Sequence, residues 1–415
     1  MYHDKLTGFS AELVELENQY GVHNYFPLPV VLTKGEGVWV WDVEGRKYLD
    51  FLSAYSAMNQ GHAHPKIVKA LSDQAGKLSL TSRAFYNDQL GPYEKFMTDT
   101  FDFDRILPMN TGVEASESAV KLARKWGYEV KGVEDNKACV VFAAGNFWGR
   151  SIAAVSSSTD DNSRMSFGPF LPGFKIIPYN DLTALEQICL DPNTVAFMVE
   201  PIQGEAGVVI PDEGYLKGVR EICTRHDVLF IADEVQTGLG RTGALTCSEQ
   251  EGVKPDLLVL GKALGGGVYP VSAVLGKHEV MNTLKPGQHG STFGGNPLAC
   301  AVGRASIQVI QEENLCQNAI LMGALFRSEL SKFKSPLVKI VRGKGLLNAI
   351  EIVPYGKNRT AWDVCISMLD KGLLAKQTHQ HIIRFAPPLL INKGQILEAC
   401  DIIKSAISEE EKQID

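Results

Sequence analysis

Four short, uninterrupted apolar runs in the middle of the chain constrain its fold more than any other feature of the sequence. The runs are Val140–Ala143, Val195–Val199, Val228–Ala232 and Leu257–Leu260. They recur roughly 25 to 55 residues apart with helix-like stretches between them, and strands that are apolar on both faces are typical of a mostly parallel sheet covered by helices. The sequence therefore predicts a large α/β domain built on these strands.

The two ends of the chain have a different character. Residues 25–50 alternate apolar side chains with Gly and Asp turns, which predicts short antiparallel strands beginning at Val30–Leu32. Mixed segments with helical spacing at 297–313 and 394–410 follow the apolar runs. We expect two domains, since the chain is long for a single core. The predicted parts are 1–55 and 312–415 for a smaller α+β domain and 56–311 for the large domain.

Charge and composition exclude several classes of partner. The chain has 41 basic and 48 acidic residues, a net charge of -7, and no long basic run, so we expect neither nucleic acid nor a membrane as its partner. No apolar stretch approaches the roughly 20 residues that span a bilayer. Met1–Asp4 resembles no leader or transit peptide, which favours the cytoplasm, or the mitochondrial matrix if a leader was removed. The 8 cysteines form no CxxC pair, and we expect no metal site.

Charged residues follow directly after three of the apolar runs. Glu200, Asp233 and Lys262 each stand where a strand ends, and ligands of parallel sheets bind beyond the carboxyl ends of the strands. A lone lysine at a strand end usually reaches to water. Together with an aspartate on the neighbouring strand, however, it is typical of pyridoxal-phosphate sites, in which a lysine bonds the cofactor and a carboxylate pairs with the pyridine nitrogen.

Two turns are candidates for binding the phosphate of such a cofactor. Thr111 and Glu114 fit a capping box, so a helix beginning at Gly112 and Val113 would direct free N–H groups at an anion; the same pattern fits an ordinary capped helix. Helical spacing continues to a predicted stop at Gly127. The second candidate, Ser291–Thr292, precedes Asn296 and Pro297, which are suited to the N-cap and first residue of another helix.

Three further residues are suited to ligand contacts. Phe147 could stack on a pyridine ring, and Arg150 could bind a carboxylate. Taken singly, however, a phenylalanine is more often a core residue and an arginine more often a surface residue. Arg384 lies within the apolar segment Ile382–Pro388, where a guanidinium needs an anionic partner.

Together these segments resemble the subgroup III aminotransferases among the fold-type-I pyridoxal-phosphate enzymes. Within them the chain is similar to the ornithine aminotransferases, from about residue 20 to 405, with Tyr25, Tyr55 and Phe147–Arg150 as the favouring features. Further resembling segments are Tyr20–Tyr25, Asn59–His62, Thr81–Phe85, Pro108–Ala115, Pro201–Gly207 and Val341–Leu346.

The resemblance implies a role for each candidate residue. Lys262 would bond the cofactor, pyridoxal 5'-phosphate, and move the proton, and Asp233 would pair with the pyridinium nitrogen. Gln236 would lie near the ring hydroxyl, and Phe147 and Val235 would cover the two ring faces. The residues implied for the phosphate are Gly112, Val113 and Ser291, with Thr292 from the partner of a homodimer.

The resemblance also implies the substrates. L-Ornithine would bind through Tyr25 and Arg150, with Tyr55 lining the pocket, and would give its δ-amine to 2-oxoglutarate, yielding glutamate 5-semialdehyde and L-glutamate. Glu205 would pair with Arg384 until the second substrate arrives. An ω-aminotransferase for acetylornithine or 4-aminobutyrate remains the alternative. A nicotinamide enzyme is disfavoured, because no GxGxxG motif begins a helix early in the chain. A non-enzymatic binding protein is disfavoured by the presence together of Lys262, Asp233, Arg150 and Arg384.

Overall fold

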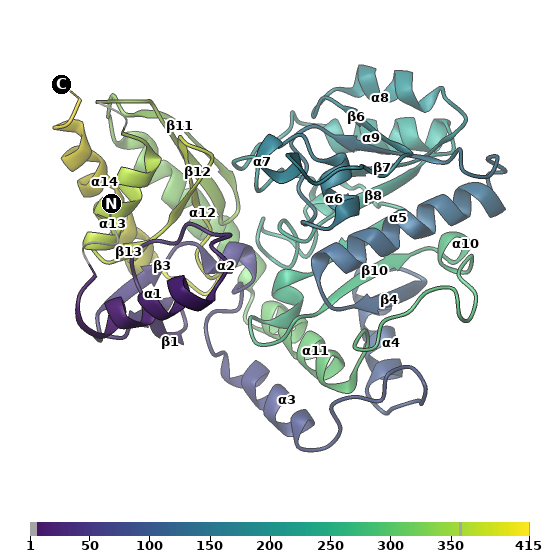
Figure 1. The fold of residues 1–415 in the computed structure, drawn as a ribbon, viewed down its shortest axis with the longest axis horizontal. Helices are drawn as coiled ribbons and strands as arrows, with labels where there is room; N and C mark the ends of the chain where they lie inside the picture. Colours follow the sequence, from purple (N-terminus) through teal and green to yellow (C-terminus); the bar gives the residue numbers. More distant parts are fainter. Residues whose placement is uncertain (1–5, 357–358, 415) are drawn as a thin grey trace.

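Two lobes lie side by side in the structure, a computed structural model that describes residues 6–356 and 359–414 (Figure 1). The expectation about Met1–Asp4 lies outside the described residues. The larger lobe comes from the middle of the chain and the smaller one from both ends, in agreement with the predicted fold class. In the described ranges, no helix combines the length and apolarity that crossing a membrane requires.

The large lobe is built on a seven-stranded sheet, counted over the described residues. In spatial order its strands are β4 (Arg105–Met109), β10 (Ser272–Gly276), β9 (Leu257–Leu260), β8 (Leu229–Asp233), β7 (Thr194–Val199), β5 (Cys139–Ala143) and β6 (Phe174–Ile177). Strand β10 runs opposite to the other six strands. The four predicted apolar strands are confirmed as β5, β7, β8 and β9.

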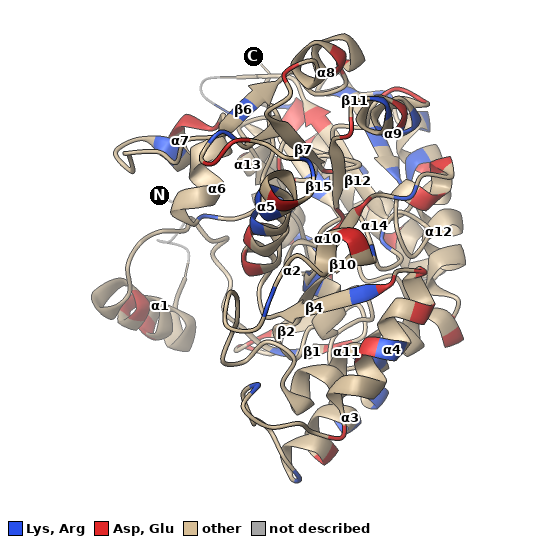
Figure 2. Ribbon diagram, turned by 90° about the vertical axis from the view of Figure 1, so that its right-hand side faces the viewer, with Lys and Arg blue, Asp and Glu red and all other residues tan. Residues whose placement is uncertain are grey.

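Helices cover both faces of this sheet, which is why its strands are apolar on both sides. The side chains of consecutive residues in β8 belong to two different hydrophobic cores. Ile231 packs on the face covered by α5 (Gly112–Glu129), whereas Phe230 packs on the face covered by α9 (Tyr215–Arg225). Many of the charged residues lie on helices and loops around the sheet (Figure 2). Glu200 and Asp233, at the ends of two strands, are buried carboxyl groups.

Helix α5 begins as predicted and ends later than predicted. The Thr111 Oγ1 accepts from the Glu114 N–H at 3.4 Å, and the Glu114 carboxylate accepts from the Thr111 N–H at 2.8 Å, so the capping box is present. The predicted stop at Gly127 is wrong, because the helix continues to Glu129. Gly127 instead lets the helix approach β7, since a Cβ there would lie 2.3 Å from Val195 Cγ1.

The small lobe holds two four-stranded sheets within the described part of the chain, together with three helices from its C-terminal part and α1 (Gly8–Tyr20) from its N-terminal part. One sheet has the order β1 (Leu32–Glu36), β2 (Trp39–Asp42), β3 (Lys47–Asp50) and β13 (Leu373–Leu374); the other has β11 (Val338–Lys344), β12 (Leu347–Ile352), β15 (Ile382–Phe385) and β14 (Lys376–Thr378). The strand expected from Val30 begins only at Leu32. The three C-terminal helices are α12 (Leu315–Lys332), α13 (Ala361–Asp370) and α14 (Lys393–Glu411), of which α14 confirms the segment predicted at 394–410.

The remaining helices connect and cover these sheets. They are α3 (Pro65–Ala75), α4 (Leu90–Phe101), α6 (Ile152–Ser157), α7 (Asp161–Arg164), α8 (Leu182–Cys189), α10 (His278–Met281), α11 (Pro297–Glu312) and the 3-10 helices η2 (Ser248–Glu251) and η3 (Lys262–Gly265). Helix α11 confirms the segment predicted at 297–313, and Asn296 caps it by accepting from the Ala299 N–H at 2.8 Å.

A short turn between the lobes has unusual backbone geometry. All four residues of α2 (Ser53–Ser56) have positive φ angles, and Tyr55 has φ 63 and ψ 46. A left-handed turn without glycine costs roughly 1–2 kcal/mol per residue. The Asp50 carboxylate helps to hold it by accepting from the Leu52 and Ser53 N–H groups at 2.9 and 2.8 Å. The turn presents the Tyr55 ring toward the ends of the large sheet.

Candidate active site

The ends of three neighbouring strands meet at one cavity, as their order in the chain predicted. Glu200 follows β7, Asp233 ends β8, and Lys262 follows β9. The cavity has a volume of about 240 Å³. Its lining comprises Gly112, Val113, Ser116, Phe147, Trp148, Gly149, Glu200, Asp233, Val235, Gln236 and Lys262. The sequence had placed seven of these residues in one cofactor site, and the fold brings all seven together.

Lys262 is half-buried and has a strained backbone conformation. It has φ 46, a left-handed conformation that lysine rarely adopts, at the start of η3. Burial lowers the pKa of its amine, and the nearby Asp233 carboxylate partly opposes that shift. A lysine whose amine loses its proton readily is suited to act as a nucleophile and as a proton carrier.

Asp233 and Glu200 are both buried carboxyl groups. Burial raises the pKa of Asp233, and one of its oxygens accepts from the Val235 N–H at 3.1 Å. Burial also raises the pKa of Glu200, and the charge of Asp233 reinforces the effect. Two carboxylates so close together in a dry site favour a cationic partner for at least one of them. The amine of Lys262 and the empty space of the cavity are where such a partner can lie.

The first turn of α5 supplies a second kind of binding group. The N–H groups of Gly112 and Val113 have no acceptor within the helix, because they belong to its first residues. Ser116, fully buried one turn later, has a hydroxyl without a hydrogen-bond partner among the described residues. Val235 packs on the same turn, since a Cβ at Gly112 would lie 3.1 Å from it. These groups together are suited to an anion such as a phosphate.

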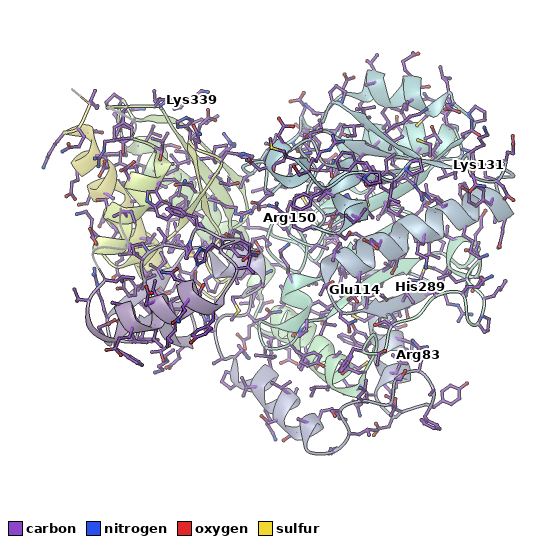
Figure 3. The ribbon with its side chains drawn as sticks, in the orientation of Figure 1. Arg83, Glu114, Lys131, Arg150, His289 and Lys339 are labelled. Atoms are coloured by element: carbon purple, nitrogen blue, oxygen red, sulfur yellow. The ribbon has the colours of Figure 1, made fainter. Side chains whose placement is uncertain are left out.

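The loop after β5 contributes an aromatic ring and a cation. The Phe147 N–H donates to Glu200 Oε1 at 3.0 Å, which fixes the loop against the strand ends. The Arg150 guanidinium carbon lies 5.4 Å from the centre of the Phe147 ring. Arg150 is exposed and lies between the two lobes (Figure 3), with no ion pair to another described residue. It is therefore free to bind an anion from outside the chain.

Arg384 is the second cation at the site, and its environment differs from that of Arg150. It is 1% exposed, and its Nη1 donates to Glu205 Oε2 and to Gln236 Oε1, each at 3.2 Å. The guanidinium also lies 4.6 Å from the centre of the Tyr55 ring. Arg384 is thus neutralised by Glu205, as the resemblance implied.

Seven predicted site residues lie outside the cavity lining, and three of them are Tyr25, Ser291 and Thr292. Tyr25 is 76% exposed. Burial raises the pKa of the Tyr55 phenol, and the nearby Tyr25 adds to that increase. The Ser291 hydroxyl accepts from the Asn110 amide at 2.9 Å and from the Gly294 N–H at 3.0 Å. Thr292 is exposed. The roles of these three residues stay predictions.

Comparison with known proteins assigns the family. A model of the family named aminotransferase class-III matches residues 20–407, nearly the whole chain. The chain is a class-III aminotransferase.

Three relatives show how closely this class-III aminotransferase resembles characterised members. Ornithine aminotransferase from Rattus norvegicus, described as mitochondrial, is 60% identical over 96% of this chain and 90% of the relative. A Toxoplasma gondii ornithine aminotransferase structure, with PLP in partial occupancy at its active site, has a TM-score of 0.96 at 47% identity, covering 98% of this chain and 96% of the other. Acetylornithine aminotransferase from Elizabethkingia anophelis has a TM-score of 0.89 at 55% identity, covering 97% and 100%.

The residues around the cavity fit the cofactor of the family, pyridoxal 5'-phosphate (PLP). The unpartnered Ser116 hydroxyl and the start of α5 match a phosphate, and the buried Asp233 carboxylate matches a ring nitrogen that carries a proton. The lowered pKa of Lys262 matches an amine that bonds a carbonyl carbon. As a class-III aminotransferase, the chain is a PLP-dependent enzyme.

Sequence reasoning missed several groups of this class-III aminotransferase site. Ser116 lies four residues after Gly112, so its place on the same helix face was a readable signal. The contact of Gln236 with Arg384 and the stacking of Tyr55 on the guanidinium had no signal in the sequence. Glu200 was noted as a strand-end acid, but its two bonds, to Phe147 and to the Gly204 N–H at 3.2 Å, depend on the fold.

Proposed function

We propose that the chain is an ornithine δ-aminotransferase, which moves the δ-amino group of L-ornithine to 2-oxoglutarate. The observation that carries this proposal is the contrast between the two cations: Arg384 is neutralised by Glu205, whereas Arg150 is unpaired among the described residues. An incoming amino acid therefore meets Arg150 as the available receptor for its carboxylate. The products would be glutamate 5-semialdehyde and L-glutamate.

The available cation determines which amine of ornithine reacts. A carboxylate bound at Arg150, assisted by Tyr25 at the α-amino end, holds the amino-acid end of ornithine away from Lys262. The side chain then extends into the cavity with its δ-amine foremost. Selection by position is sufficient, because catalysis depends strongly on holding the reacting atoms in the right geometry. Tyr55 would line the path of the side chain.

The residues of the cavity have separate tasks in the proposed reaction. PLP supplies the aldehyde that takes up the amino group and the ring that stabilises negative charge at the reacting carbon. Asp233 would keep a proton on the ring nitrogen, and Gln236 would lie near the ring hydroxyl. Lys262 moves a proton to and from the reacting carbon, for which its lowered pKa is suited.

The second substrate needs the other cation. Glutamate must present its α-amine, so its α-carboxylate has to lie near the reacting carbon, where Arg384 is the receptor. Glu205 must therefore leave Arg384 before 2-oxoglutarate or glutamate can bind productively. The turn Gly204–Gly207 that carries Glu205 contains two glycines, and Gly207 has φ 109. Masking by Glu205 thus separates the two half-reactions.

A related donor is the second candidate. The high identity to an acetylornithine aminotransferase from Elizabethkingia anophelis supports an enzyme in which the α-amine carries an acetyl group. 4-Aminobutyrate is a third possible donor. The identities to ornithine aminotransferases, including 60% to the rat protein, favour ornithine.

The test of the proposal compares the half-reactions of the PLP-loaded enzyme with three amino donors: ornithine, acetylornithine and 4-aminobutyrate. Each donor is mixed with the enzyme in a stopped-flow instrument, and the change of the cofactor absorbance is followed. We expect ornithine to react with a kcat/KM at least about tenfold above acetylornithine and 4-aminobutyrate, equivalent to about 1.4 kcal/mol. A higher efficiency with acetylornithine would replace the proposal by the second candidate.

We also infer that the active enzyme is a homodimer in which Thr292 contacts the cofactor phosphate of the partner. Thr292 is exposed in its own chain, and its neighbour Phe293 is 49% exposed. Phe85 and Tyr86, 75% and 103% exposed, add apolar surface of the kind that subunit contacts cover. The domain boundaries at residues 55 and 311 and the cytoplasmic location stay predictions.

A further inference from the structure

One face of the small-lobe sheet carries four side chains toward the turn that holds Glu205. Strands β14 and β15 are antiparallel, with Lys376 opposite Arg384 and Thr378 opposite Ile382. Residues directly opposite each other in an antiparallel pair point to the same face, as do residues two apart along one strand. Lys376, Thr378, Ile382 and Arg384 therefore share one face.

Three of these four side chains contact the turn. The Thr378 hydroxyl donates to the Glu205 carbonyl at 2.7 Å, and Arg384 Nη1 donates to Glu205 Oε2 at 3.2 Å. Ile382 packs against Gly207 so closely that a Cβ there would lie 2.5 Å from its Cδ1. The fourth, Lys376, lies opposite Arg384 in this row, and the Glu205 carboxylate is near enough to raise the pKa of its amine.

Lys376 is a partly buried cation with no fixed partner. Among the described residues, none forms a hydrogen bond or ion pair with its amine, although the side chain is only partly accessible. Burial lowers the pKa of Lys376, while the Cys365 thiol and the Glu205 carboxylate raise it. An unpaired ammonium in such a place is unfavourable, unless another state of the enzyme supplies its anion.

The proposed reaction contains such a state. When the α-carboxylate of glutamate or 2-oxoglutarate binds Arg384, the Glu205 carboxylate loses its partner and faces a second negative charge. A carboxylate displaced into a partly dry site needs a new cation or a path to water. The Glu205 side chain is 35% exposed, which leaves its carboxylate room to change partner.

We propose that Lys376 receives the Glu205 carboxylate whenever a substrate carboxylate occupies Arg384. Glu205 then exchanges between two cations on one sheet face, with Arg384 as its partner for the ornithine half-reaction and Lys376 as its partner for the glutamate half-reaction. Lys376 is thus a specificity-determining residue that favours the unmasked state. This inference rests on the proposed function and adds to it the group that makes unmasking favourable.

The test measures both half-reactions of the PLP-loaded holoenzyme in Lys376→Met and Lys376→Arg. For Lys376→Met we expect kcat/KM for glutamate and for 2-oxoglutarate to fall about tenfold, or 1.4 kcal/mol, with the ornithine value within about twofold of the parent. Lys376→Arg should retain most of the glutamate reaction because it keeps the charge.

A control removes a positive charge from the same sheet at a distance from the site. Lys339 on β11 binds Glu351 at 2.6 Å and lies at the outer side of the small lobe (Figure 3). Lys339→Met should leave both half-reactions unchanged. If it lowers the glutamate reaction as much as Lys376→Met does, the effect is one of overall charge and the inference is overturned.

A double-mutant cycle separates the proposed role from direct substrate binding. In the Glu205→Ala background there is no carboxylate to receive, so adding Lys376→Met should change the glutamate reaction by less than about twofold. A loss that persists in that background would assign Lys376 to the substrate instead, and an equal loss for both donors would make its role structural. If ornithine does not react with the parent, the proposed function fails, while the glutamate arm still tests Lys376.

Discussion

At the scale of single residues, the site depends on charged groups held where an isolated charge is costly. Asp233 and Arg384 are 4% and 1% exposed, and Lys262 is half-buried with a lowered pKa. Burying an ion requires a partner, and for Arg384 the partner is Glu205. Among the described residues, the Asp233 carboxylate accepts one N–H group, that of Val235, and the amine of Lys262 is nearby. Its free oxygen is therefore available to the ring nitrogen of the cofactor.

Replacing Asp233 by Asn tests that assignment. A neutral amide cannot keep a proton on the ring nitrogen, so we expect the single-turnover rate with ornithine to fall roughly a hundredfold or more, about 2.7 kcal/mol of barrier. The fold should persist, because the amide oxygen can still accept from the Val235 N–H. Stopped-flow absorbance measures the rate, and the visible band of the bound cofactor serves as the control. An unchanged rate would remove Asp233 from this role.

At the scale of elements, Glu200 joins two loops that carry different parts of the site. Its two oxygens accept from the N–H groups of Phe147 and Gly204, at 3.0 and 3.2 Å. Phe147 follows β5, whereas Gly204 directly precedes Glu205 in the turn after β7. A single buried carboxyl group therefore couples the ring-stacking loop to the turn that masks Arg384.

Glu200→Gln should change how stability depends on pH in the cofactor-free protein. Burial raises the pKa of Glu200 from 4.5 to about 8, so the folded protein keeps a proton that the unfolded chain releases. Raising the pH between these values therefore destabilises the folded state. We expect the unfolding midpoint of the parent to fall over this range, and that of the variant to fall less.

The variant should also be less stable overall. One of the two N–H groups would face the amide nitrogen of Gln instead of an acceptor, at a cost of about 1–3 kcal/mol. Thermal melts followed by circular dichroism at several pH values measure both effects. Equal pH slopes in parent and variant would show that Glu200 does not hold the proton.

Helix α5 gives a second prediction at this scale. An alanine at Gly127 would improve helix propensity by roughly 1 kcal/mol, but its Cβ would lie 2.3 Å from Val195 Cγ1. Overpacking of this kind costs about 1–3 kcal/mol, so Gly127→Ala should be destabilising in urea unfolding. Gly394 in α14, where a Cβ would be no closer than 3.4 Å to any atom, is the matched control and should be unchanged or slightly more stable as alanine. A stabilised Gly127 variant would contradict the close packing of α5 on β7.

At the scale of the whole molecule, the proposed homodimer makes each site depend on two chains. A Lys262→Ala subunit and a Thr292→Asp subunit should each be inactive, the second because its carboxylate repels the phosphate. In a hybrid dimer, one of the two sites would then contain both substitutions and the other site would contain neither. Random mixing should restore roughly a quarter of the wild-type sites, since half of the dimers are hybrids with one intact site each.

Activity after mixing, compared with each parent alone, measures this recovery. Subunit exchange has to be verified independently, by mass spectrometry of differently tagged chains. No recovery with exchange complete would place Thr292 in the site of its own subunit.

The sequence alone was sufficient for the features that depend on local patterns. Apolar runs located β5, β7, β8 and β9, because strands covered on both faces are apolar throughout. The residues after them, including Asp233 and Lys262, were predicted to meet because neighbouring parallel strands end at one edge. The start of α5 was predictable as well, since a capping box is formed by residues three apart.

Only the tertiary structure decided the features that depend on contacts between distant segments. Helix α5 continues past Gly127 because that glycine packs on β7, and Tyr55 lies in a left-handed turn that its own sequence disfavours. The bonds of Glu200 and the place of Lys376 beside Arg384 follow from strand order and register. Long-range packing outweighs local preference in each case, because burial and close contact contribute more free energy than the propensity of a single residue.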